Sequence, residues 1–217
     1  MLAALGAASV LCIALELLRE HRYDGFDYRF LLWNLVLAWI PFVLALVIYD
    51  RYRRGTCILR LAPAVALWLL FLPNAPYILT DFIHLSPAGR APLWFDGAMV
   101  SVFAWTGLLL GFVSLYLLHV VARNRFGTAA AWCGVVSVLG LVSAGVCVGR
   151  FLRWNSWDLL VRPGQRLAEL SSVADPDAIA RGTVVTLLLT CLLAAGYASF
   201  YALLGARLDP PRRIGRR

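Results

Sequence analysis

The chain has 217 residues, of which 61% are hydrophobic and only 15% carry a charged side chain. A soluble domain of this size needs more polar residues to cover its surface, so the composition excludes an ordinary soluble protein and indicates several membrane spans. The formal net charge is +8, and every basic residue other than His is Arg. The distribution of Arg among the loops therefore predicts the orientation of the chain.

Six segments are apolar over about 20 residues, the length that an α-helix needs to cross a hydrocarbon core of about 30 Å. The first has no basic start and no cleavage site, so we expect a retained helix rather than a signal peptide. No repeat or long linker divides the chain, which predicts a single all-α transmembrane domain over residues 1–217. The expected spans are roughly residues 1–18, 30–49, 60–79, 98–121, 129–149 and 183–204.

The second and fourth spans carry residues that favour contact between helices. Asn34 lies about one turn inside the second span, where a buried amide is expected to hydrogen-bond to a neighbouring helix rather than to a ligand. Gly107 and Gly111 form a GxxxG pattern in the fourth span, and small residues at this spacing allow a close approach of another helix.

The third span contains two prolines within the string FLPNAPYILTDFIHL at residues 71–85. Pro73 and Pro76 have no N–H, and each ring opposes a continuous helix, so we expect this span to break near its outer end. Asn74 suits the cap of a restarted helix. The backbone groups freed by the break cannot face lipid, so their surroundings must be protein or water.

A restarted helix would bring four polar side chains to one face. Asn74, Tyr77, Asp81 and His84 are spaced by three, four and three residues, which places them within about 80° of arc at about 100° per residue. Asp81 and His84 are close enough in this register to hydrogen-bond or to exchange a proton, and they are the candidates for catalytic acid and base. The alternative is an ordinary helix end whose Asp and His lie in water.

The end of the fifth span adds two arginines in the string GRFLRWNSWDLL at residues 149–160. We expect one of two arrangements. Either Arg150 and Arg153 form salt bridges with Asp81, Asp96 or Asp158, or together they bind a phosphate or carboxylate group, which Arg binds with two parallel hydrogen bonds. The remaining candidates for a site that binds an anion or a headgroup are Asn155, Trp157 and Asp158 in the predicted outer loop 150–182.

Arg is concentrated in the short loops at residues 50–60 and 122–127 and in the tail at residues 207–217. Because short cytoplasmic loops carry an excess of basic residues, both termini are predicted to be cytoplasmic, and the polar stretches then lie on the outer face. The basic tail suits anionic lipid of the inner leaflet, and no nucleic-acid partner is expected, because no aromatic platform accompanies it. The oligomeric state is left open.

Motifs of known enzyme classes are missing from the sequence. It has no GxSxG elbow, no HExxH, no phosphate-binding loop and no paired cysteines with the spacing of metal ligands. We therefore expect no metal site and no cofactor, and whether the protein is an enzyme is left open.

Several strings of this sequence resemble one family. WLLFLPNAPYILTDFIHL, PLWFD and GRFLRWNSWDLL, together with WNLVLAWIPF at residues 33–42, are similar to the uncharacterised bacterial membrane family called domain of unknown function 1361. The resemblance extends over nearly the whole chain. It implies a multi-pass protein of the bacterial cytoplasmic membrane, and it implies no substrate, reaction or catalytic residue.

Three functions are compatible with these patterns. The first is an outer-face site for an anionic or lipid-linked headgroup. The second is a structural or assembly protein whose outer polar network only stabilises the helix bundle. The third, a transporter, is favoured least, because the break lies away from the membrane midplane and no repeat is visible.

Overall fold

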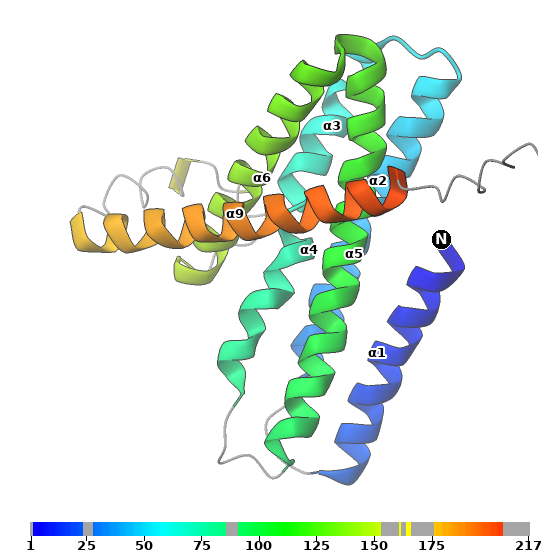
Figure 1. The fold of residues 1–217 in the computed structure, drawn as a ribbon. Coiled ribbons are helices and arrows are strands. Elements are labelled where there is room, and N and C mark those ends of the chain that lie inside the picture. The colour runs from blue at the N-terminus through cyan, green and yellow to red at the C-terminus, as the bar shows by residue number, and fades with distance from the viewer. Residues whose placement is uncertain are drawn as a thin grey trace, which may run out of the picture.

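The computed structural model describes residues 2–23, 28–85, 91–152, 161, 164–165 and 176–205. Its elements in this part of the chain are all helices (Figure 1). They are α1 (Leu2–Arg22), α2 (Arg29–Arg53), α3 (Ile58–Phe71), α4 (Asn74–Tyr77), the 3₁₀-helix η1 (Ile78–His84), α5 (Leu93–Phe126), α6 (Thr128–Phe151) and α9 (Pro176–Gly205). Within the described residues, six segments are long and apolar enough to cross a membrane, which confirms the expected number of candidate spans; α3, α4 and η1 together form the third.

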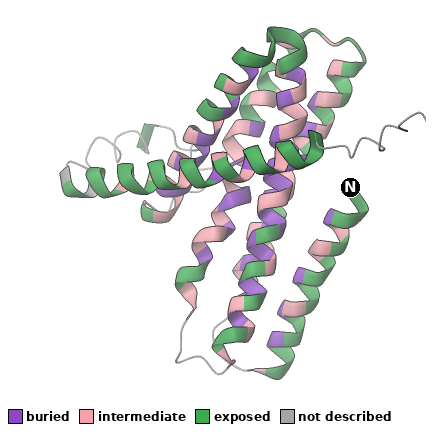
Figure 2. Cartoon of the chain, in the orientation of Figure 1, coloured by how far each residue is buried: buried purple, intermediate pink, exposed green. Residues whose placement is uncertain are grey.

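Helix α5 is the centre of the fold. It has 34 residues, about 51 Å at a rise of about 1.5 Å per residue, and it contacts α1, α2, α4, α6 and α9. Figure 2 shows buried residues along most of its length, as expected for a helix with neighbours on several sides. Gly107 and Gly111 of α5 lie directly against Ala75 of the third span.

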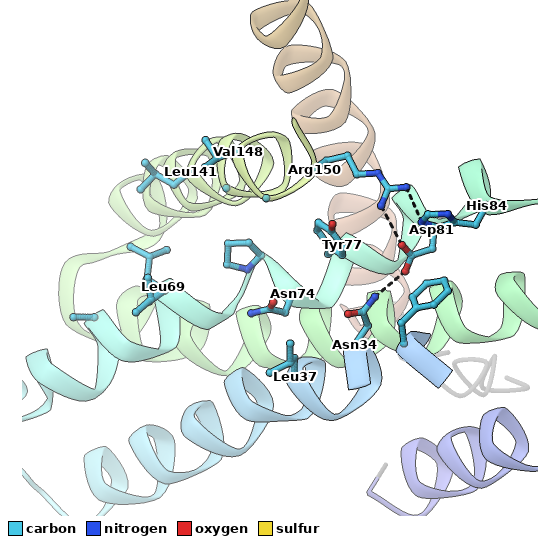
Figure 3. A pocket seen from close by; sticks show the side chains of 16 residues that line it. Asn34, Leu37, Leu69, Asn74, Tyr77, Asp81, His84, Leu141, Val148 and Arg150 are labelled. Atoms are coloured by element: carbon cyan, nitrogen blue, oxygen red, sulfur yellow. Dashed lines mark hydrogen bonds and ion pairs between the residues drawn. The ribbon is translucent and has the colours of Figure 1, made fainter. Parts of the chain in front are cut away.

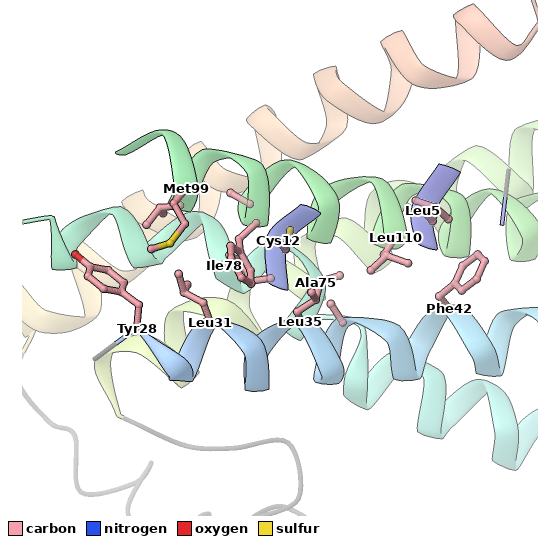
Figure 4. Packing of buried hydrophobic residues seen from close by; sticks show 14 of the residues in the cluster. Leu5, Cys12, Tyr28, Leu31, Leu35, Phe42, Ala75, Ile78, Met99 and Leu110 are labelled. Atoms are coloured by element: carbon pink, nitrogen blue, oxygen red, sulfur yellow. The ribbon is translucent and has the colours of Figure 1, made fainter. Parts of the chain in front are cut away.

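The larger apolar core lies between α2, α5 and the segment that follows the break in the third span (Figure 4). Apolar side chains from α1 close this core on one side. Its fully buried members include Leu31, Phe42, Ala75, Ile78, Met99, Phe103 and Leu110, with Cys12 from α1. Burial of such side chains supplies the packing energy that holds the broken span against α5.

A serine in the middle of α5 joins three helices by hydrogen bonds. The Trp68 indole N–H donates to Ser114 Oγ at 2.6 Å, and the Ser114 hydroxyl donates to the Pro41 carbonyl oxygen at 3.0 Å. Both side chains are buried, so these bonds connect α3, α5 and α2 within the apolar interior.

The break in the third span is confirmed, and its hydrogen bonds explain its shape. Because Pro76 has no N–H, the Leu72 carbonyl accepts instead from the Ala75 amide at 3.1 Å. The Phe71 carbonyl then accepts from the side-chain amide of Asn74 at 2.8 Å. Asn74 therefore caps the end of α3, whereas the sequence predicted a cap at the start of the next helix.

The segment after the break differs from the α-helix assumed in the sequence analysis. Only α4, with four residues, is α-helical, and η1 continues as a 3₁₀-helix of seven residues. In a 3₁₀-helix residues three apart lie directly above one another, so Asp81 and His84 still share a face. The segment also packs closely against α5. A Cβ added at Gly107 would lie 2.6 Å from the Ala75 carbonyl oxygen, which confirms that the GxxxG pattern allows a close contact.

The last long helix begins earlier than expected. Residues 150–182 were predicted to be an outer loop, but α6 continues to Phe151 and α9 begins at Pro176. Helix α9 crosses α5 and α6 instead of running parallel to them (Figure 1). His119 on α5 contributes to this contact, because its Nδ1 lies 2.9 Å from the Tyr197 hydroxyl and its ring stacks on Tyr201.

Candidate functional site

A cavity of about 640 Å³ lies where α2, the broken third span and the end of α6 meet (Figure 3). One end of the cavity is polar and is lined by Asn34, Asn74, Tyr77, Asp81, His84 and Arg150. The other end is apolar and includes Leu69, Leu141 and Val148. A polar end beside an apolar wall is the chemical pattern of a site for an amphiphilic ligand.

Asp81 lies at the centre of the polar end. Its side chain is 1% exposed, and its two carboxylate oxygens accept from different helices. The Asn34 amide of α2 donates to Oδ2 at 2.9 Å, and Arg150 of α6 donates to Oδ1 at 3.4 Å. The first contact confirms that Asn34 hydrogen-bonds to another span.

Arg150 also contacts the rest of η1. One of its terminal nitrogens donates to the Thr80 carbonyl oxygen at 3.1 Å and lies 3.2 Å from His84 Nε2. A guanidinium group can only donate, so His84 Nε2 must accept, and the imidazole is then neutral with its proton on Nδ1. The guanidinium carbon lies 5.9 Å from the centre of the Tyr77 ring. Arg150 therefore joins the carboxylate and the imidazole.

A small residue on α6 sets the position of Arg150. A Cβ added at Gly145 would lie 2.8 Å from Pro73 Cγ, so only glycine allows α6 to lie this close to the break. Arg150 follows little more than one helical turn later, at the end of α6, where its side chain reaches η1. The proline that breaks the third span also packs on the helix that carries the arginine.

A second buried ion pair lies near the same end of the bundle. Arg19 of α1 donates to Asp96 of α5 at 2.6 and 3.2 Å, and both side chains are at most 5% exposed. Glu16, about one turn before Arg19, is 2% exposed. From the sequence, Asp96 was one expected partner of Arg150 or Arg153; the structure instead pairs Asp96 with Arg19 and Arg150 with Asp81. Glu16 and Arg19 at a spacing of three within an apolar helix were the available signal for this pair.

Tyr28 connects the two ion pairs. The Arg19 guanidinium lies 4.4 Å from the centre of the Tyr28 ring, and the Tyr28 hydroxyl donates to the His84 carbonyl oxygen at 3.1 Å. Burial, followed by the nearby Asp96 carboxylate, raises the pKa of Tyr28, so its hydroxyl keeps the proton that it donates. A continuous polar network thus extends from α1 to α6.

Nine residues were predicted from the sequence as candidates for the site. The structure brings five of them to one cavity: Asn74, Tyr77, Asp81, His84 and Arg150. The other four, Arg153, Asn155, Trp157 and Asp158, lie outside the described residues. Within the described part of the chain, no three His, Cys, Asp or Glu side chains are grouped closely enough to hold a metal ion. Asn34 also lines the cavity, although from the sequence it was expected only to contact another helix, as an amide inside a span commonly does.

Replacing Asn34 with leucine is expected to lower the free energy of unfolding by about 1–3 kcal/mol. Leucine has nearly the same size, but Asp81 Oδ2 then loses its donor while the carboxylate stays buried. Thermal unfolding in detergent measures the effect. Trp33 to leucine is the matched control, because Trp33 is the adjacent residue of α2 and its side chain is exposed. Equal unfolding temperatures for the two variants would show that the Asn34 bond contributes nothing.

Comparison with known proteins identifies the family. A family described as a protein of unknown function (DUF1361) matches residues 33–194, and the chain therefore belongs to this family. No curated protein and no solved structure matches the chain. The matched range contains the break in the third span and Arg150, so most of the candidate site lies inside the family region.

Proposed function

We propose that this member of the DUF1361 family binds an amphiphile with an anionic headgroup in the cavity between α2, the broken third span and α6. The observation that carries the proposal is the position of Arg150 in the cavity wall, between polar side chains at one end and apolar ones at the other. Phosphate and carboxylate are the anions that a guanidinium group binds with two parallel hydrogen bonds.

Arg150 keeps donors for such a group. Of its five N–H donors, the contacts with described residues use one on Nη1 and two on Nη2. The contact with Asp81 is long, at 3.4 Å, so it is the one that a bound anion would most readily replace. Asn74 and Tyr77, in the same wall, add an amide and a phenol for polar groups of the ligand.

The headgroup is proposed to come from the extracytoplasmic side of a bacterial cytoplasmic membrane. The connections from α2 to α3 and from α5 to α6, which contain the Arg-rich short loops, lie together at one end of the bundle, away from α4 and from the end of α6 that carries Arg150 (Figure 1). Basic short loops favour the cytoplasmic side, so both termini are proposed to be cytoplasmic.

The second candidate function is structural. Arg150 already contacts Asp81, Thr80 and His84, and these contacts join α6 to η1 without any ligand. In that case the network only holds the bundle together. The two functions predict different outcomes when Arg150 is replaced.

Replacing Arg150 with glutamine is expected to weaken binding of an anionic phospholipid by about tenfold to a hundredfold. A hydrogen bond to a charged group contributes about 1.5–3 kcal/mol, which corresponds to this range. Titration of the detergent-purified protein with phosphatidylglycerol and phosphatidylcholine, followed by native mass spectrometry, measures both affinities. Arg51 to glutamine is the control, because it removes one positive charge from an exposed position at the other end of the bundle.

Three outcomes distinguish the alternatives. Loss of phosphatidylglycerol binding in Arg150→Gln alone, with a normal unfolding temperature, supports the headgroup site. A lower unfolding temperature with unchanged lipid affinity overturns it in favour of the structural function. Displacement of the lipid by equimolar inorganic phosphate would assign the site to a soluble anion instead.

A further inference from the structure

A second cavity, of about 530 Å³, lies between α3, α5 and α6 in the half of the bundle away from Arg150. Its lining is apolar and includes Ile58, Val65, Leu118, Phe126 and Val135. Two lining side chains carry polar nitrogens. The Trp68 indole N–H donates to Ser114, and His119 Nδ1 bonds to the Tyr197 hydroxyl, whereas His119 Nε2 is buried with no hydrogen-bond partner in the described part of the chain. Apart from this one imidazole nitrogen the lining is apolar, so the cavity suits hydrocarbon over most of its surface.

The two cavities are neighbours along α3, on the side that faces α6. Ala66 and Leu69 of α3 line both of them. Small side chains on each wall leave the space between the helices: Ala62 and Ala66 on α3, and Ala131 and Gly134 on α6. Taken end to end, the two neighbouring cavities define a groove with Arg150 at one end and, at the other, walls that are apolar except for His119.

The length of this groove distinguishes between classes of lipid. Along α6, Ala131 and Arg150 are separated by about 28 Å at a rise of about 1.5 Å per residue. The hydrocarbon core of a bilayer is about 30 Å thick, so the acyl chains of one leaflet reach about 15 Å. A chain that starts at a headgroup beside Arg150 must therefore be about twice as long as one leaflet to fill the groove.

We infer that the ligand is a single-chain lipid phosphate whose chain exceeds the depth of one leaflet, as in the polyprenyl phosphates. The inference rests on the proposed headgroup site, and it adds the class of the hydrocarbon. The phosphate lies beside Arg150, and the chain passes Leu69 and Ala66 into the second cavity. Ordinary phospholipids fill only the part of the groove next to the headgroup.

A substitution at the junction of the two cavities tests the inference. Ala66→Phe places a ring where the cavities meet, and its control is Leu67→Phe on the adjacent residue, which is exposed and lines neither cavity. The probes are a polyprenyl phosphate with an extended chain longer than ~30 Å and a phosphatidic acid of ordinary chain length, titrated by native mass spectrometry.

Ala66→Phe is expected to weaken binding of the polyprenyl phosphate by at least about tenfold, the loss for two or more methylene groups that are no longer buried. Binding of phosphatidic acid stays within about twofold, and Leu67→Phe changes neither affinity. Equal wild-type affinity for the two lipids, or equal effects of Ala66→Phe on both, overturns the inference. The headgroup proposal is tested separately, by Arg150→Gln with phosphatidylglycerol, so a failure of that proposal can be distinguished from a failure of this inference.

A second pair of variants covers the case in which Ala66→Phe does not fold. A Cβ added at Gly134 or at Gly140 of α6 meets nothing within 4 Å, so both positions accept a larger side chain. Gly134 lines the second cavity and Gly140 lines neither. Gly134→Leu is expected to weaken only the long-chain lipid, and Gly140→Leu to change nothing; identical behaviour of the two variants would overturn the inference.

Discussion

Replacing Asp96 with alanine is expected to lower the free energy of unfolding by about 3 kcal/mol. The variant leaves the Arg19 guanidinium, whose side chain is 5% exposed, without the carboxylate to which it makes two hydrogen bonds. Loss of one partner of a buried ion pair costs about 3–5 kcal/mol, because the remaining charge is no longer compensated. The lower end of that range applies, since the acidic residue Glu16 is still within electrostatic reach of Arg19.

Thermal unfolding in detergent measures the Asp96 effect against a surface pair. Asp50 and Arg54 form a salt bridge on α2 with side chains that are 53% and 73% exposed, so Asp50→Ala is expected to change the free energy of unfolding by at most about 1 kcal/mol. The double variant Arg19→Met, Asp96→Leu replaces both charges with apolar groups and is expected to recover stability. If Asp96→Ala and Asp50→Ala lower the free energy of unfolding equally, the buried Arg19–Asp96 pair contributes no more to stability than an exposed pair.

Replacing Gly107 with alanine is expected to destabilise the protein by about 1–3 kcal/mol, the usual cost of forcing extra volume into a packed core. The added Cβ would lie 2.6 Å from the Ala75 carbonyl oxygen and 2.9 Å from Ile78 Cδ1, and both residues are fully buried. The backbone of α4 must therefore move away from α5. Because α4 and η1 carry the polar residues of the cavity, binding of the anionic lipid is expected to weaken as well.

The direction of the stability change distinguishes a close helix contact at Gly107 from an open helical position. In an open helical position, alanine is more stable than glycine by about 1 kcal/mol. Gly140→Ala on α6 is the matched control, because the added Cβ meets nothing within 4 Å. Thermal unfolding of both variants in one detergent is the measurement. If Gly107→Ala unfolds at the same temperature as Gly140→Ala or above it, the contact between α4 and α5 is not as close as described.

Much of this fold is readable from the sequence, because membrane spans obey a strong local constraint. A span must be apolar over about 20 residues and must satisfy its own backbone hydrogen bonds, and both properties depend on neighbouring residues in the chain. The break at Pro73 and Pro76 is equally local, since it follows from two missing N–H groups. The close approach of this segment to α5 is not local, because it depends on the absence of a side chain at Gly107 of another helix.

Within the candidate site, the sequence determined which residues of one element share a face, and only the tertiary structure decided their partners. Asp81 and His84 lie together because they are three residues apart on one helix. Which arginine reaches them depends on how α6 packs on Pro73, and which acid pairs with Arg19 depends on the contact between α1 and α5. A charged side chain inside a membrane needs a partner, but its own sequence neighbours do not say from which helix that partner comes.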